Sequence, residues 1–212
     1  MRTLVWYRGK DLRVFDHVPL ALAAKQGEVV PVFVLEPKYF EPERVLAHAH
    51  RLQGLLHALD GLRYDLKARG SELLLVAGPS TQAIPALVDQ LGIARVFAQR
   101  ACEPSARARD EKVNTRTAGK LTLTEGETLA PYGSLRTGAG KPYHVFSAFA
   151  RAFRAQVKVH DPKPAPESLP KWSAETKRAV RSLPLLQRLP TPQQLGLKEN
   201  PRLLAAVETL AN

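Results

Sequence analysis

The sequence is poor in cysteine, because Cys102 is the only one among its 212 residues. A single thiol cannot form a disulfide within the chain, and it cannot supply a zinc or iron–sulfur site that several cysteines build. Long apolar runs are lacking too. No stretch approaches the roughly 18 residues that cross a bilayer, and charge interrupts the opening segment before a signal-peptide core develops. We therefore expect a cytoplasmic protein that is neither exported nor held in a membrane.

Carboxylates are scarce relative to cations. The chain has 20 aspartate and glutamate residues against 31 lysine and arginine residues, which gives a net charge of +11. Such a surplus concentrates polyanions near the surface, so nucleic acid or an anionic small ligand is a reasonable partner. The cations are scattered along the chain, and the other explanation is that they keep the protein in solution. Charge alone does not choose between these explanations.

Several motifs that carry chemistry are absent. The glycine-rich stretch 137–142 is not a phosphate-binding P-loop, since Leu135 replaces the first glycine and Pro142 follows the lysine. No Gly-x-Gly-x-x-Gly follows the first apolar segment. His48 and His50 lie two residues apart on an expected helix and face different ways, so we expect no metal site. Cys102, without a nearby histidine, is interpreted as a loop thiol and not as a catalytic one.

The apolar segments that are present predict the fold. Five of them are short and largely continuous, which is typical of strands buried on both faces, at 3–7, 29–35, 72–77, 95–99 and 121–124. Helical periodicity separates them at 17–26, 43–69 and 80–91. Residues 1–155 are therefore expected to form an α/β domain, a five-stranded parallel sheet with helices on both faces. We expect a Rossmann-like or flavodoxin-like strand order with the first strand central.

From about Asp161 onward, frequent prolines interrupt regular secondary structure. We expect residues 156–212 to form a proline-rich linker or wrapping tail, with its part from 160 onward packed along the α/β domain in an extended form. A short terminal helix is expected at 200–210. The apolar anchors of this tail would be Trp172, Leu183, Leu185, Leu186 and Leu189.

Function is expected in the loops that follow the strands, because ligands of open parallel sheets bind beyond the carboxyl ends of the strands. In the first of these loops, Arg8 and Arg13 either hold an anionic ligand or pair with Asp11 and Asp16. Asp16 is also the expected N-cap of the following helix. The loops that begin at Leu35-Glu36-Pro37 and at Gln99-Arg100 offer polar groups that can hydrogen-bond the edge of a bound ring system.

Four stretches of the chain resemble segments of DNA photolyases and cryptochromes. They are Leu4-Val5-Trp6-Tyr7-Arg8 with Asp11-Leu12-Arg13 and Asp16-His17, then 70–78 with 84–87, then Glu103-Pro104 with Arg107-Ala108-Arg109-Asp110, and finally 142–153. Residues 189–197 are similar to the linker into the second domain of that family. Lys10 stands as an insertion relative to the family pattern.

The resemblance implies that two domains hold different cofactors. In the family, the N-terminal α/β domain holds a light-harvesting chromophore, a folate or a flavin-like molecule, and a helical C-terminal domain holds FAD and the lesion pocket. That second domain has no counterpart in the 212 residues, so we expect no stoichiometric FAD and no DNA repair from this chain alone. A separate flavin-containing partner protein is the expected complement.

The resemblance also implies the residues of a chromophore site. A folate is disfavoured, because Ser105 and Ala106 stand near the asparagine and glutamate of folate-binding members. An FMN or deazaflavin chromophore is favoured instead, although His48 replaces a common arginine. The residues expected to border it are Tyr7, Arg8, Leu35, Glu36, His48, Arg51, Gln99, Arg100 and Glu103.

Two functional classes remain open at this point. The first is a stand-alone antenna domain that binds a chromophore in the cleft beyond the strands. The second is a module without a chromophore, whose basic surface contacts nucleic acid or a partner protein.

Overall fold

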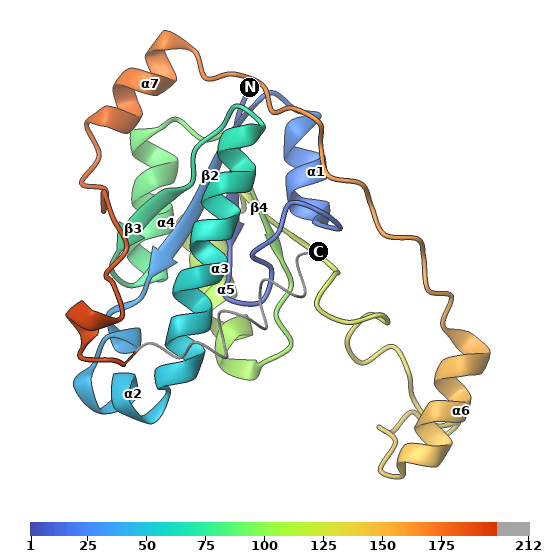
Figure 1. Cartoon of the computed structure of the whole chain (residues 1–212). Helices are drawn as coiled ribbons and strands as arrows, with labels where there is room; N and C mark the ends of the chain where they lie inside the picture. Colours follow the sequence, from blue (N-terminus) through green and yellow to red (C-terminus); the bar gives the residue numbers. More distant parts are fainter. Residues whose placement is uncertain (199–212) are drawn as a thin grey trace.

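The computed structural model describes residues 1–198 of the chain. Its core is one five-stranded sheet in the order β3-β2-β1-β4-β5, and every neighbouring pair is parallel. The strands are β1 (Arg2–Tyr7), β2 (Glu28–Leu35), β3 (Leu74–Ala77), β4 (Arg95–Gln99) and β5 (Leu121–Thr124). The predicted fold class and the central position of the first strand are both confirmed (Figure 1).

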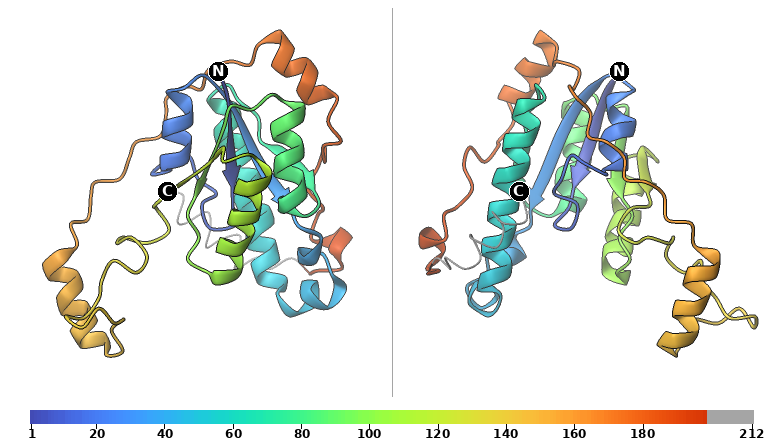
Figure 2. Two further views of the ribbon diagram at one scale, coloured as in Figure 1. Left: turned by 180° about the vertical axis from the view of Figure 1, so that it is seen from behind. Right: turned by 45° about the vertical axis from the view of Figure 1, so that its right-hand side comes forward.

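Helices cover both faces of the sheet, because alternate residues of each strand point to opposite sides. On one side, Val5 and Tyr7 of β1 pack against α1 (Val18–Ala24) and α3 (Ala49–Ala68). On the other side, Leu4 and Trp6 pack in the layer that holds α4 (Ser80–Gln90) and α5 (Pro104–Arg116). Two views in Figure 2 show the sheet between these layers.

Two predictions about helix ends were wrong. The helix expected over 43–69 is interrupted at His48, which ends α2 (Pro42–Ala47) and precedes α3 with a backbone outside the helical region. A short 3₁₀ turn, η1 (Pro37–Tyr39), comes before α2. The N-cap of α1 is His17 and not Asp16, since the Nδ1 atom of His17 accepts the backbone N–H of Leu20 at 3.1 Å. Asp16 itself has a positive φ of 48°.

The tail follows the α/β domain, as far as residue 198. The backbone N–H of Leu169 donates to the backbone carbonyl of Arg69 at 2.8 Å, and the Trp172 indole N–H donates to the carbonyl of Val29 at 2.6 Å. Leu183 is buried, whereas Leu186 is 38% exposed. The tail also holds α7 (Ala174–Arg181) and a 3₁₀ turn, η2 (Gln193–Leu195), neither of which was predicted. The helix expected at 200–210 lies outside the described residues.

One segment departs from the rest. Residues 128–160, which we call the arm, leave the end of β5 and carry α6 (Phe146–Gln156) away from the sheet (Figures 1 and 2). Within the arm, the Phe149 ring lies 6.3 Å from Tyr143 and 6.1 Å from Phe153, centroid to centroid. The predicted domain boundary at 155 falls within α6 and stays a prediction. Among residues 1–198, no helix is long and apolar enough to cross a membrane.

Candidate functional site

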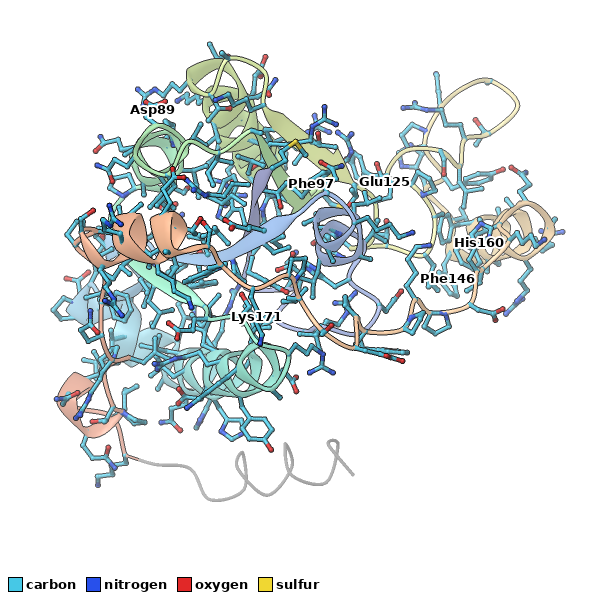
Figure 3. The ribbon with its side chains drawn as sticks, turned by 90° about the horizontal axis from the view of Figure 1, so that it is seen from above. Asp89, Phe97, Glu125, Phe146, His160 and Lys171 are labelled. Atoms are coloured by element: carbon cyan, nitrogen blue, oxygen red, sulfur yellow. The ribbon has the colours of Figure 1, made fainter. Side chains whose placement is uncertain are left out.

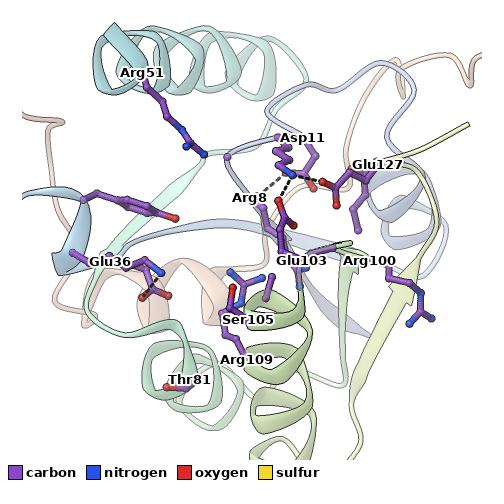
Figure 4. A pocket seen from close by; sticks show the side chains of 17 residues that line it. Arg8, Asp11, Glu36, Arg51, Thr81, Arg100, Glu103, Ser105, Arg109 and Glu127 are labelled. Carbon is purple, nitrogen blue, oxygen red and sulfur yellow. Dashed lines mark hydrogen bonds and ion pairs between the residues drawn. The ribbon is translucent and has the colours of Figure 1, made fainter. Parts of the chain in front are cut away.

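A cleft of about 420 Å³ lies where β1, β2 and β4 end. Parallel strands bring their carboxyl ends to one edge of the sheet, so the loops after them meet there. The cleft is lined by residues 8–11 after β1, by Glu36, Lys38 and Tyr39 after β2, and by 99–101 after β4. Arg51 of α3 and the first turn of α5 complete it (Figure 4).

A second chamber of about 460 Å³ adjoins this cleft and shares Gly9, Lys38, Tyr39 and Arg51 with it. Its character is different, because much of its wall is apolar. Those apolar wall residues are Leu12, Phe33, Leu52, Leu55 and Ala58. Arg44 and His48 add polar groups. The site therefore has a polar chamber and an apolar chamber side by side, which suits a ligand with a ring system and a polar end.

Arg8 is the most buried cation of the polar chamber, and its side chain is only 10% exposed. Its Nη1 atom donates to Asp110 Oδ2 at 2.8 Å, and its guanidinium carbon lies 4.4 Å from the centroid of the Trp6 ring. The Nε and Nη2 atoms of Arg8 are buried without a hydrogen-bond partner. Burial lowers the pKa of Arg8 from its ordinary value, and the Asp110 carboxylate opposes that shift.

Asp11 has a structural role in the same loop. Its Oδ1 atom accepts the backbone N–H of Arg8 at 2.5 Å, and its Oδ2 atom lies 3.3 Å from Nε2 of His17. The His17 ring stacks on Tyr7 at 4.5 Å, and burial raises the pKa of the Tyr7 phenol well above its usual value. Asp11 therefore fixes the turn after β1 and does not pair with the Arg8 side chain.

The sequence offered Asp11 and Asp16 as partners for Arg8 and Arg13. The structure corrects this for Arg8, which pairs with Asp110, a residue 102 positions further along the chain. Arg13 does approach Asp16, at 3.9 Å. Long-range pairing of this kind has no signature in the local sequence, so the loop alone could not reveal it.

The rim of the cleft is closed by a small ionic network. The Lys10 ammonium contacts the carboxylates of Glu103 and Glu127, and Glu127 also accepts the backbone N–H of Cys102 at 2.9 Å. The contact with Glu103 raises the pKa of Lys10, and it lowers the pKa of Glu103. Burial raises the pKa of the Cys102 thiol. Lys10, the apparent insertion, thus ties three loops together.

The other carboxylates and amides of the cleft are also constrained. Glu36 Oε1 accepts one hydrogen bond from the backbone N–H of Ser80, at 3.2 Å, and a second from the Ser80 hydroxyl group. Gln99 is 4% exposed, and its Nε2 atom is buried without a partner. A Cβ at Gly126, where φ is 156°, would lie 2.4 Å from that Nε2 atom, so a larger residue there would displace the end of the Gln99 side chain.

The nine residues expected to border a chromophore divide into three groups. Six line the polar chamber, namely Arg8, Glu36, Arg51, Gln99, Arg100 and Glu103. His48 lines the apolar chamber, together with Arg51. Tyr7 and Leu35 lie in the hydrophobic core, at 0% and 2% exposure, and line neither chamber.

Sequence reasoning missed several lining residues, above all Tyr39, Ser105 and Arg109. The Arg109 guanidinium donates to Asp110 Oδ1 at 2.9 Å and lies 4.9 Å from the centroid of the Trp6 ring. The stretch Arg107-Ala108-Arg109-Asp110 was noticed as a family-like motif, and it was the available signal. Within residues 1–198, no group of three or more acidic, histidine or cysteine residues is placed to hold a metal ion.

Comparisons with known proteins agree with this fold. A family model described as DNA photolyase matches residues 3–169. The deoxyribodipyrimidine photo-lyase of Synechococcus sp. (strain ATCC 27144) is 34% identical over 198 residues, which are 91% of this chain and 40% of that protein. The chain thus spans about two fifths of the length of that photolyase.

Solved structures extend the comparison. A class III photolyase from Agrobacterium tumefaciens superposes with a TM-score of 0.70 at 27% identity, over 89% of this chain and 38% of that one. A photolyase from Sulfolobus tokodaii, described with two FAD molecules and a novel light-harvesting cofactor, superposes with a TM-score of 0.65 over 85% of this chain and 41% of that one. At 20% identity, that likeness shows the fold alone. The chain belongs to the DNA photolyase and cryptochrome family and corresponds to its N-terminal α/β domain.

Proposed function

We propose that the two-chambered cleft binds a light-harvesting chromophore of the flavin or deazaflavin type. The observation that carries this proposal is a polar chamber, lined by Arg8, Arg51 and Gln99, that adjoins an apolar one. Hydrogen-bonding groups beside an apolar wall suit a ligand with a flat ring and a polar edge. A flavin-like molecule has carbonyl oxygens on one edge of a flat apolar ring.

The residues of the chain would bind and orient this molecule. The apolar chamber, with Phe33 and Leu52 in its wall, suits the flat ring, and Arg51 lies at the junction of both chambers. The donors of the polar chamber suit the polar edge and side chain of the ligand. When bound, such a chromophore absorbs light and passes the excitation energy to a second flavin.

We also propose that repair chemistry requires a flavin-containing partner. This chain covers 40% of the photolyase relative from Synechococcus, and that relative extends well beyond the matched region. Side chains alone do not carry out light-driven electron transfer to DNA, because cofactors supply such chemistry. Light-dependent repair of thymine dimers by the purified chain, above a control without protein, would contradict this proposal.

The direct test is a fluorescence titration of the purified protein with FMN and with a deazaflavin. We expect saturable binding that Arg51→Ala weakens about tenfold or more, since a charged hydrogen bond contributes roughly 1.5–3 kcal/mol. Arg63→Ala is the matched control, because Arg63 lies on the same helix, pairs with Asp60 and lines neither chamber. Absence of saturation up to millimolar ligand would overturn the chromophore proposal.

The second candidate function is contact with nucleic acid, and the arm favours it. Residues 128–160 contain five lysines and arginines and no aspartate or glutamate, which are Arg136, Lys141, Arg151, Arg154 and Lys158. Exposed aromatic rings lie among them, with Phe146 at 79% and Tyr132 at 57% exposure. Cations beside exposed rings are typical of surfaces on which single-stranded bases stack.

Salt dependence tests this second candidate. Each phosphate contact contributes about 0.7 to the slope of log affinity against log salt for a single strand. We therefore expect Arg154→Gln to reduce the slope by about that amount, and Lys67→Gln, an exposed lysine on α3, to leave it unchanged. A slope near zero for the unaltered chain would exclude a nucleic-acid surface on the arm. A partner protein would then be the remaining ligand for a basic interaction module.

A further inference from the structure

The tail supports the apolar chamber from outside. Its residues 189–198 lie against α2 and α3, and Figures 1 and 2 show η2 beside α2. Leu197 is buried there in a small hydrophobic cluster. The other buried members of this cluster are Val45, Leu52 and Leu56. Next to it, the Gln53 side chain donates to the carbonyl of Lys198 at 2.7 Å. The tail is therefore anchored to the two helices that line the chamber.

The chamber wall and this cluster are built from adjacent residues. In three pairs of neighbours, the first residue lines the apolar chamber and the second packs in the cluster. These pairs are Tyr39 with Phe40, Arg44 with Val45, and His48 with Ala49. Leu52 belongs to both, because it lines the chamber and is a buried member of the cluster. Since packed interiors transmit displacements, a shift of the cluster also shifts the chamber wall.

Helix α2 depends on this cluster for its position. It has six residues, which is fewer than an isolated helix needs to be stable in water. Val45 is its one buried side chain, and the tail supplies Leu197 to the same cluster. The turn of η2 directs Leu197, because the Leu197 N–H donates to the Pro192 carbonyl at 2.9 Å and Gly196 has a φ of 69°. Removing Leu197 would take away one of the four buried members of the cluster that holds α2.

The tail packs loosely before it reaches this anchor. Leu183 is buried on the other face of the sheet, in the layer of α4. After it, a cavity of about 340 Å³ lies between residues 188–192 and α3. Few contacts thus hold the tail between Leu183 and Leu197. The contact of Leu197 can therefore open locally while the sheet stays folded.

We propose that Leu197 couples the position of the tail to ligand binding in the chromophore cleft. With Leu197 in the cluster, α2 holds Arg44 and His48 in the chamber wall. When Leu197 leaves, α2 loosens and the ligand loses that wall. Leu197 is a positioning residue, because it lines neither chamber and acts through Val45. This inference rests on the proposed function and deepens it, because it identifies the segment that regulates the site.

Leu197→Ala tests the coupling, and Leu183→Ala is the matched control. Leu183 is also a buried leucine of the tail, but it packs in the cluster on the other face of the sheet and lines neither chamber. We expect Leu197→Ala to weaken FMN about fivefold or more, and Leu183→Ala to change the affinity less than about twofold. Leu197→Met keeps most of the side-chain volume and should restore the affinity.

Hydrogen exchange measures the chamber wall without a chromophore. The Val45 N–H donates to the Glu41 carbonyl at 2.9 Å, and the His48 N–H donates to the Arg44 carbonyl at 3.0 Å. Both amides report the opening of α2. We expect Leu197→Ala to speed their exchange about fivefold or more, and Leu183→Ala to leave it unchanged.

The coupling also acts in the reverse direction. If the tail strengthens ligand binding, the ligand strengthens the contact of the tail by the same factor. In the unaltered chain, we therefore expect saturating FMN to slow the exchange of the Leu197 amide about fivefold or more.

The outcomes separate the coupling from the chromophore proposal. If FMN does not bind but Leu197→Ala alone speeds exchange in α2, the chromophore proposal fails and the link between the tail and the chamber wall stands. If FMN binds and Leu197→Ala leaves its affinity unchanged, the coupling is refuted and the chromophore proposal stands. Equal effects of Leu183→Ala and Leu197→Ala would also refute the coupling, because they would report a general loss of stability. Unchanged exchange in α2 in both variants refutes it as well.

Discussion

The α/β domain, which we call the body, buries aromatic residues, whereas the arm exposes an aromatic ring. In the body, Trp6, Tyr7 and Phe97 are almost completely buried, whereas Phe146 of the arm is 79% exposed. Figure 3 shows Phe97 in the sheet and Phe146 on the helix that stands apart from it. Charge follows the same division, because the cations that line the cleft lie among carboxylates and those of 128–160 do not. The body buries these aromatic rings in its core, and the arm exposes Phe146 to solvent.

The largest expected effect is on a buried charge of the body. Asp110→Ala removes the only carboxylate between Arg8 and Arg109, and it leaves two guanidinium groups without their acceptor. Breaking a buried ion pair in this way costs about 3–5 kcal/mol. Urea denaturation measures the loss, and Asp89→Ala, an exposed residue of α4, is the control. A loss below about 1 kcal/mol would show that the cluster does not stabilise the fold.

The tail should show the next largest effect, because it is anchored to the body and not to the arm. Trp172→Ala removes an indole that packs against the core and donates to the Val29 carbonyl. For a partly buried ring we expect a loss of about 2–3 kcal/mol, somewhat below the range for fully buried aromatics. Trp172→Phe keeps most of the packing and should cost about 1 kcal/mol, the contribution of one hydrogen bond. Equal losses for both variants would assign the anchor to the hydrogen bond alone.

The part of the body that could be predicted from the sequence is the part with local patterns. Continuous apolar runs such as 29–35 identify buried strands, and glycines with positive φ, Gly70 and Gly92, follow the ends of two helices. Helix α5 escaped prediction because its one buried apolar residue is Val113, too few for a recognisable period. The break at His48 also escaped, since apolar spacing continues on both sides of it.

The candidate site was predictable only to the level of its loops. Topology places Glu36, Arg51 and Gln99 at one edge of the sheet, and the structure brings them to one chamber. The direction in which single side chains point was harder to predict. Tyr7 and Leu35 end their strands with the side chain toward the helices of the core, so neither lines the cleft. The pairing of Arg8 with Asp110 depends on tertiary packing and leaves no trace in either local segment.

The ionic network at the rim should make a smaller contribution that depends on pH. The pKa of Glu103 is lowered and that of Lys10 is raised, so their pairing stabilises the fold most between the unfolded values of roughly 4.3 and 10.4. The contribution is lost as pH falls through the lowered pKa of Glu103, or rises through the raised pKa of Lys10. Both side chains are about half exposed, so screening keeps the effect of Lys10→Met below about 1 kcal/mol.

Urea denaturation at neutral and acidic pH measures this effect, with Lys67→Met as the control for a lysine exposed on α3. We expect the difference between the unaltered chain and Lys10→Met to shrink in acid and in high salt. A difference that stays constant across pH would mean that Lys10 contributes by packing and not by charge.

The smallest expected effect is on the arm. Phe146→Ala removes a ring that is 79% exposed, and surface substitutions of this kind change the free energy of unfolding by less than about 0.5 kcal/mol. Phe97→Ala removes a ring that is 1% exposed, and it should cost about 3–5 kcal/mol by the same measurement. The two phenylalanines thus test the division between body and arm with identical chemistry. If Phe146→Ala lowers stability as much as Phe97→Ala does, the arm packs against the body in solution, and its exposed rings are not a surface for a partner. If stability is unchanged while binding to single-stranded DNA falls, the ring serves recognition, because stacking on one aromatic ring contributes roughly 1–3 kcal/mol.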